Sequence, residues 1–219
     1  MNEELQLLEQ SKNEIDKSLM MIPLITEEES KSLIRWYQTH KHLRAIGDGS
    51  DYRGIDYIHI HTPWVRDIFN RISFDVVSNI YAATGQQVYP EMKAINEWEI
   101  GGVQQPHFDT YSNQDMKHDN IEETPSREWT VILYINGHES YQGGETYFPN
   151  MGAIGETITP VAGSGIVFRG IDHEHGVYPV RRGSRFTISQ WFTSNYHRMI
   201  TDEKTKDLNL DHVSLRNMF

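Results

Sequence analysis

The spacing of apolar residues changes near Met92, and this change constrains the fold more than any other feature of the sequence. Before it, apolar side chains recur every three to four positions, which is the period of an amphipathic helix. After it, they alternate in short runs separated by turn residues, which is the period of a strand. Helices followed by many short strands predict a mainly β, α+β fold, a sandwich or barrel buttressed by N-terminal helices.

Three helices are expected in the N-terminal part. The first would carry Leu5, Leu8, Ile15 and Leu19 along one face. The capping-box pattern Thr26-Glu27-Glu28-Glu29 predicts that the second begins at Thr26. The third is expected to start at Thr62-Pro63 and to stop near Gly85. Its apolar face consists of Val65, Ile68, Phe69, Ile72, Val76 and Ile80.

The alternating part predicts five strands, at Lys93–Ile100, Trp129–Ile135, Glu145–Phe148, Gly165–Phe168 and Arg185–Phe192. On the last of these, alternation places Arg185, Thr187, Ser189 and Trp191 on one face. Thr110–Glu128 is polar, lacks a period and is too long for a hairpin loop. It is therefore either an active-site lid or a disordered insertion.

Composition restricts the class of protein. The formal charge of −11 disfavours nucleic acid as a partner, because phosphate binding needs clustered Lys and Arg. No apolar stretch approaches the roughly 20 residues that span a bilayer, and the N-terminus is acidic, so we expect a soluble, cytoplasmic protein without a membrane partner. Cysteine is absent, so a metal ion would have to be bound by His, Asp or Glu.

His107-Phe108-Asp109 is a candidate metal-binding motif. Residues two apart on a strand point to the same face, so the imidazole and the carboxylate can share one ion. A single His-x-Asp triplet is weak evidence, but His173 and His175 lie downstream. Two histidines and a carboxylate on one side of Fe(II) leave open positions for other ligands.

Four motifs in order then resemble the prolyl 4-hydroxylase-like Fe(II)/2-oxoglutarate dioxygenases. They are Pro106–Asp109, Thr130–Asn136, Gly143–Pro149 and His175–Arg185. The resemblance covers about residues 96–192. It implies a double-stranded β-helix (jelly-roll) barrel over about 92–195, supported by the helical part at about 1–88, in a single domain comprising 1–219.

The resemblance implies roles for particular residues. His107, Asp109 and His175 would bind Fe(2+), and Arg185, ten residues after His175, would bind 2-oxoglutarate. Prolyl 4-hydroxylases generally have lysine at that position, whereas arginine can hold a carboxylate through two parallel hydrogen bonds. His173 is the rival for the third ligand position.

Further pocket residues follow from the same resemblance. Tyr134 is either a 2-oxoglutarate contact or a core tyrosine, Trp98 would wall the pocket, and Thr187 would help to seat 2-oxoglutarate or only satisfy its neighbours. The Gly143-Gly144 pair is expected to form a turn or bulge. His40 with His42, and His59 with His61, lack a carboxylate at ligand spacing and are expected at the surface or in packing.

The implied reaction is hydroxylation of a substrate C–H with release of succinate and CO2, ascorbate being a candidate reductant. A prolyl residue in a peptide or protein is the first expectation for the substrate. Another residue, a free amino acid or a small molecule is the alternative, because substrate selection depends on loops such as Thr110–Glu128 and Ser50–His61. A non-catalytic barrel that binds a metal or ligand is a third alternative. The sequence gives no indication of oligomeric state.

Overall fold

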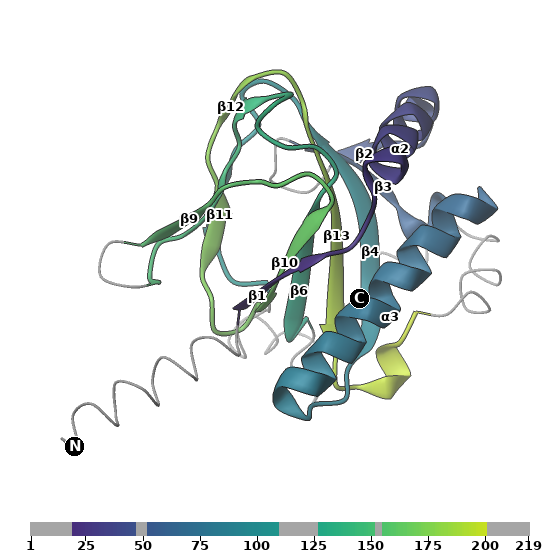
Figure 1. The fold of residues 1–219 in the computed structure, drawn as a ribbon, viewed down its shortest axis with the longest axis vertical. Coiled ribbons are helices and arrows are strands. Elements are labelled where there is room, and N and C mark those ends of the chain that lie inside the picture. The colour runs from purple at the N-terminus through teal and green to yellow at the C-terminus, as the bar shows by residue number, and fades with distance from the viewer. Residues whose placement is uncertain (1–18, 47–51, 110–126, 152–154, 201–219) are drawn as a thin grey trace, which may run out of the picture.

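The computed structural model describes residues 19–46, 52–109, 127–151 and 155–200. Figure 1 shows two layers of strands with two helices on the outside of the larger one. We call the seven-stranded layer, with order β1-β10-β6-β13-β4-β3-β2, the main sheet. We call the four-stranded layer, with order β5-β11-β8-β9, the minor sheet. All described pairings within them are antiparallel, which confirms a mainly β jelly-roll with helical support.

The main sheet contains the longest strands. Its members are β1 (Leu19–Pro23), β2 (Ala45–Ile46), β3 (Tyr52–Asp56), β4 (Tyr89–Trp98), β6 (Trp129–Tyr134), β10 (Ser164–Arg169) and β13 (Arg185–Thr193). The minor sheet consists of β5 (Gln104–His107), β8 (Thr146–Phe148), β9 (Glu156–Ile158) and β11 (His175–Val177). A separate pair joins β7 (Gln142–Gly143) and β12 (Val180–Arg182). All five strands predicted from alternation are confirmed, with ends shifted by a few residues.

Two helices cover the outer face of the main sheet. Helix α2 (Glu27–Thr39) begins as predicted, since the Thr26 hydroxyl accepts from the Glu29 backbone while the Glu29 carboxylate accepts from the Thr26 backbone. Helix α3 (Pro63–Thr84) ends at Gly85, whose φ of 74° closes the helix in the left-handed conformation. All six residues of its predicted apolar face are buried. The hydroxyl of Thr62 accepts from the Trp36 indole instead of capping α3.

Short single-turn helices complete the chain: η1 (Lys41–Leu43), η2 (Tyr57–His59) and η4 (Tyr196–Arg198). Among the helices that the structure describes, none is both long enough and apolar enough to span a bilayer.

Two described segments of the N-terminal part form strands that the helical periodicity did not predict. Leu19 belongs to strand β1, which pairs with β10 at one edge of the main sheet, and the rest of the predicted first helix lies outside the described residues. The proposed substrate loop at Ser50–His61 contains β3 and η2, because β3 extends the sheet beside β4. Strands β1 and β3 are short and form by pairing with strands that are distant in the sequence, and local periodicity does not indicate such pairing. The predicted lid at Thr110–Glu128 falls mainly on residues that the structure does not describe.

Two large apolar clusters, and a small third one of Trp98, Val177 and Val180, fix how the layers meet. The larger one lies between the helices and the main sheet, and its strand members include Ile95, Leu133 and Ile188. The second large one lies between the sheets, where Ile132 and Phe168 of the main sheet pack with Phe148 of the minor sheet. The inner face of the main sheet therefore looks onto the minor sheet, and polar residues on that inner face point into the space between them.

Candidate metal and 2-oxoglutarate site

His107, Asp109 and His175 lie together at the mouth of the space between the two sheets. His107 ends β5 and His175 begins β11, and the two are direct partners in the minor sheet. Asp109 follows β5 by two residues, and its backbone N–H donates to the Gly170 carbonyl at 3.2 Å. One ligand atom from each residue lies within 4.8 Å of the other two. Among the described residues this is the one grouping of three such side chains that could hold a metal ion.

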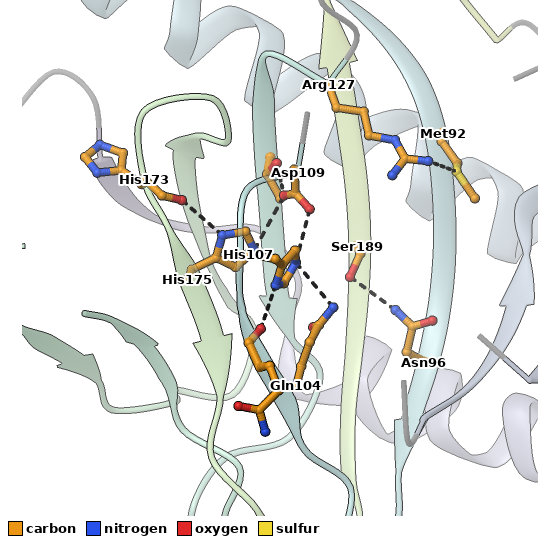
Figure 2. Close-up of polar contacts among 11 residues, drawn as sticks. Met92, Asn96, Gln104, His107, Asp109, Arg127, His173, His175 and Ser189 are labelled. Carbon is orange, nitrogen blue, oxygen red and sulfur yellow. Dashed lines mark hydrogen bonds and ion pairs between the residues drawn. The ribbon is translucent and has the colours of Figure 1, made fainter. Parts of the chain in front are cut away.

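Both imidazoles are oriented by a backbone carbonyl two residues earlier. Nδ1 of His107 lies 3.0 Å from the Gln105 oxygen, and Nδ1 of His175 lies 3.1 Å from the His173 oxygen. A carbonyl can only accept, so each Nδ1 carries the proton and each Nε2 keeps its lone pair. Each Nε2 lies 3.6 Å from an Asp109 carboxylate oxygen, as the dashed lines of Figure 2 show. The three lone-pair donors therefore converge on one point.

His173, the rival ligand, is not a member of this group. Its carbonyl orients His175, and its ring packs edge-on against Phe148 with centroids 6.0 Å apart. His173 thus contributes its backbone carbonyl to the site, and its ring lies outside the three-residue cluster.

Asp109 is held in its ionised form. Burial raises the pKa of its carboxyl group, but His175, His107 and the Thr130 hydroxyl outweigh burial and bring that pKa well below its usual range. Thr130 donates to the carboxylate at 2.5 Å. Burial lowers the pKa of His175, whereas the contact with Asp109 and the Gln105 carbonyl outweigh burial and raise that of His107. The result is an anionic oxygen ligand between two imidazoles.

The three residues open into a pocket of about 420 Å³, including its mouth, that extends between the sheets. Its other walls are formed by Tyr52, Asn96, Trp98, Gln104, Thr130, Ile132, Val177, Arg185, Thr187, Ser189 and Trp191. The face predicted for the last strand therefore lines the pocket as a whole. Trp98 and Thr187 are both in the lining and are joined to each other, because the indole N–H donates to the hydroxyl at 3.4 Å.

Arg185 is buried in this pocket, with 1% of its surface exposed. Its Nη2 donates to the Thr146 hydroxyl at 3.2 Å, and its Nε has no hydrogen-bond partner. The guanidinium carbon lies 5.0 Å from the centre of the Trp98 ring and 5.5 Å from that of Tyr134. No carboxylate in the described part of the chain pairs with it. A buried cation without an anionic partner is costly, so this position suits the carboxylate of a ligand.

Tyr134 supports Arg185 indirectly. Its hydroxyl donates to Thr146 at 2.8 Å, and Thr146 in turn accepts from Arg185. Tyr134 itself is fully buried and is not part of the pocket lining. Gly144 has a φ of 67°, and a Cβ there would lie 3.0 Å from Cδ of Arg185, so the glycine lets the chain pass close to the arginine. Gly143 has a φ of 76° as well, so both glycines adopt the left-handed conformation that tight backbone bends use.

Thr130 and Thr146 are site residues that the sequence reasoning missed. The signal for Thr130 was present, since it alternates with Ile132 and Tyr134 on the inner face of β6. Gln104 had no such signal, because it lies three positions before His107 and regular alternation would place the two on opposite faces. Of the remaining histidines, His40 stacks on Trp36 with ring centroids 4.5 Å apart, which agrees with a packing role.

Comparison with known proteins shows a family resemblance over part of the chain. Residues 94–193 match the model of the 2OG-Fe(II) oxygenase superfamily, whose members use Fe(2+) and 2-oxoglutarate. Prolyl 3-hydroxylase 3 of Homo sapiens is 33% identical over 70 residues, a stretch that covers 31% of this chain. The same stretch covers only 9% of that relative, so this chain corresponds to a small part of it.

Solved structures share the fold at low identity. A viral collagen prolyl hydroxylase from Paramecium bursaria Chlorella virus-1, solved with 2-oxoglutarate, is 16% identical with a TM-score of 0.61, covering 80% of this chain and 94% of its own. HygX from Streptomyces hygroscopicus, solved with nickel, 2-oxoglutarate and hygromycin B, is 11% identical with a TM-score of 0.59, covering 82% and 84%. Over residues 94–193, which include the cluster of two imidazoles and a carboxylate, this chain is therefore similar to the 2OG-Fe(II) oxygenase superfamily and resembles its prolyl hydroxylases.

Proposed function

We propose that this chain is an Fe(II)- and 2-oxoglutarate-dependent hydroxylase whose substrate is a prolyl residue in a peptide or protein. The observation that carries the proposal is the presence, in one pocket, of three converging metal donors and of a buried arginine with no anionic partner among the described residues. The donors suit Fe(II), and the arginine suits the distal carboxylate of a dicarboxylic 2-oxo acid. The metal donors alone would not indicate a 2-oxo acid, and the buried arginine alone would not indicate a metal ion.

His107, Asp109 and His175 would hold the ion. The two Nε2 atoms offer lone pairs because their Nδ1 protons are engaged by backbone carbonyls. Asp109 supplies the negative charge and is kept ionised by its neighbours, while Thr130 fixes its second oxygen. When bound, Fe(II) and 2-oxoglutarate supply oxygen activation coupled to decarboxylation, which yields succinate, CO2 and a hydroxylated substrate.

Arg185 would bind the distal carboxylate of 2-oxoglutarate. Thr146 and Tyr134 fix the direction of its guanidinium, and the Trp98 ring covers it. Thr187, held by the Trp98 indole, would present its hydroxyl to the same ligand. Burial of the whole arrangement excludes water from the ion pair, which strengthens it.

The choice of a prolyl substrate is supported by the relatives. The human relative and the viral structure are both named prolyl hydroxylases, the latter for collagen. The test is to incubate the Fe(II)-loaded protein with 2-oxoglutarate, O2 and ascorbate, with a proline-rich peptide or with a panel of free amino acids. We expect succinate formation to rise with the peptide, together with a 16-Da mass gain on proline. Succinate that rises only with free amino acids would refute the prolyl assignment.

A small-molecule substrate is the second candidate. The observation that favours it is the similarity to HygX, whose structure contains hygromycin B. An aminoglycoside panel in the same succinate assay distinguishes the two candidates, because coupling to an aminoglycoside and not to the peptide would select the second. Absence of any succinate above the level of an Asp109→Ala control would leave a non-catalytic binding barrel.

A further inference from the structure

The side chain of Gln104 reaches the metal cluster, although its position in the sequence does not suggest it. Its Nε2 lies 3.3 Å from Nε2 of His107, the atom expected to bind the ion. Figure 2 draws two dashed lines from this His107 nitrogen, one to Asp109 and one to Gln104. Gln104 also lines the pocket. No role has been given to it in the site described so far.

A β-bulge brings Gln104 onto the inner face. In the pairing of β5 with β11, His107 lies opposite His175 while Gln104 lies opposite Val177. Three steps along β5 thus match two along β11, so β5 contains one extra residue. The extra residue turns Gln104 and His107 to the same side, and Pro106, which has no N–H to leave unpaired, lies in the bulged stretch. Bulges beside active sites commonly redirect a side chain in this way.

The amide of Gln104 and a metal ion compete for one lone pair. Because Nδ1 of His107 carries its proton, Nε2 can only accept, and the Gln104 amide N–H is the donor that it accepts from. An ion bound at that Nε2 takes the lone pair. The amide N–H then needs another acceptor close to the ion, since a half-buried donor left unpaired is unfavourable.

Gln104 lies on the side of His107 that faces Arg185. Val177 pairs with Gln104 on one side and with Thr146 on the other, and Thr146 accepts from Arg185. Gln104, Val177 and Thr146 therefore form a row across the minor sheet that ends beside Arg185. A ligand that extends from the metal cluster to Arg185 passes this row.

We propose that Gln104 is a 2-oxoglutarate-binding residue whose amide changes acceptor, from Nε2 of His107 in the metal-free protein to a carboxylate oxygen of 2-oxoglutarate beside the ion. This inference rests on the proposed function. It extends the proposed function by assigning the second anchor of the cosubstrate, at the end opposite Arg185. Hydrogen bonds to a charged acceptor are stronger than those to a neutral one, so the exchange from the imidazole to the carboxylate favours cosubstrate binding.

The test uses Co²⁺ as a redox-stable substitute for Fe(II) in the full chain. Calorimetry of the metal-free protein gives the Co²⁺ affinity, and the visible Co²⁺ spectrum, titrated with 2-oxoglutarate, gives the cosubstrate affinity. The variants are Gln104→Met, which keeps the length and removes the donor, and Gln104→Glu, which replaces the donor with a negative charge. Gln105→Met is the matched control, because Gln105 is an exposed neighbour whose orienting carbonyl is retained.

We expect Gln104→Met to bind Co²⁺ about two- to tenfold more tightly in the absence of 2-oxoglutarate, because the amide no longer competes for the lone pair, and to weaken 2-oxoglutarate binding by about fivefold, from the difference between neutral and charged acceptors. Gln104→Glu should weaken 2-oxoglutarate binding further, and Gln105→Met should match the wild type. If Gln104 only covers His107, Gln104→Met instead leaves the 2-oxoglutarate affinity of the Co²⁺-loaded protein unchanged, and the proposal is wrong. Unchanged values for both Gln104 variants also overturn it. Failure of Co²⁺-loaded wild type to bind 2-oxoglutarate refutes the proposed function itself.

Discussion

Replacing Thr130 with valine tests whether the carboxylate of the metal cluster depends on its hydroxyl partner. Thr130→Val keeps the shape of the side chain and removes the donor that lies 2.5 Å from Asp109 Oδ2. Both residues are buried, with 1% of Thr130 and 8% of Asp109 exposed, so water cannot readily replace the lost hydrogen bond. A hydrogen bond to a charged group contributes about 1.5–3 kcal/mol, which corresponds to about 10- to 100-fold in a binding constant.

We expect Thr130→Val to weaken Co²⁺ or Mn²⁺ binding by about 10- to 100-fold, the range typical of residues that orient a metal ligand. Calorimetric titration of the metal-free protein measures the change. Thr130→Ser is the matched control, because it keeps the hydroxyl and should remain within about threefold of the wild type. Valine and serine variants with equal metal affinity would refute the reasoning, since they would show that the hydroxyl does not position Asp109.

Other substitutions separate the parts of the site. His107→Ala and Asp109→Ala should each abolish succinate formation and lower metal affinity by more than about 100-fold, the upper range for residues that only orient a metal ligand. A variant that keeps its metal affinity or its activity would show that the replaced residue is not a metal ligand. Arg185→Met should weaken 2-oxoglutarate binding by at least about 10-fold. The same substitution should raise the free energy of unfolding of the ligand-free protein by about 1–3 kcal/mol, because it removes a buried cation without an anionic partner among the described residues. Urea denaturation measures the second effect, and a less stable variant would contradict it. Gly176→Ala should lower the free energy of unfolding by about 1–3 kcal/mol, because its Cβ would lie 2.6 Å from the Tyr147 ring and 2.8 Å from the Gln104 carbonyl oxygen. Unchanged stability would mean that both the ring and the strand that carries Gln104 move aside without cost.

The sequence predicted the elements whose pattern is complete within one segment. Helix α3 has its proline start, its glycine stop and an unbroken apolar face, and each of these was confirmed. The long strands β4 and β13 were predicted because alternation extends over enough residues to be recognised. Short strands such as β1 and β3 exist because a distant strand pairs with them, and no local pattern announces that pairing.

The same limit applies to the site. Spacing and motif order identified the three clustered side chains and Arg185, and the structure brings all of them to one pocket. Gln104 was missed because a bulge breaks the alternation on which face assignments depend. Tyr134 was predicted as either a 2-oxoglutarate contact or a core tyrosine, and in the structure it is buried outside the pocket lining and joined to Arg185 through Thr146. Indirect contacts of this kind depend on which side chains meet across neighbouring strands, and the periodicity within one segment does not specify those meetings.

The two ends of the pocket belong to different layers, and this has a mechanical consequence. The imidazoles come from the minor sheet, whereas Arg185 comes from the main sheet. A dicarboxylate held at one end by the ion and at the other by the guanidinium would act as a removable cross-link between layers. Because ligands that bind only the folded form stabilise it, metal and 2-oxoglutarate together should raise the melting temperature by more than the sum of their separate effects.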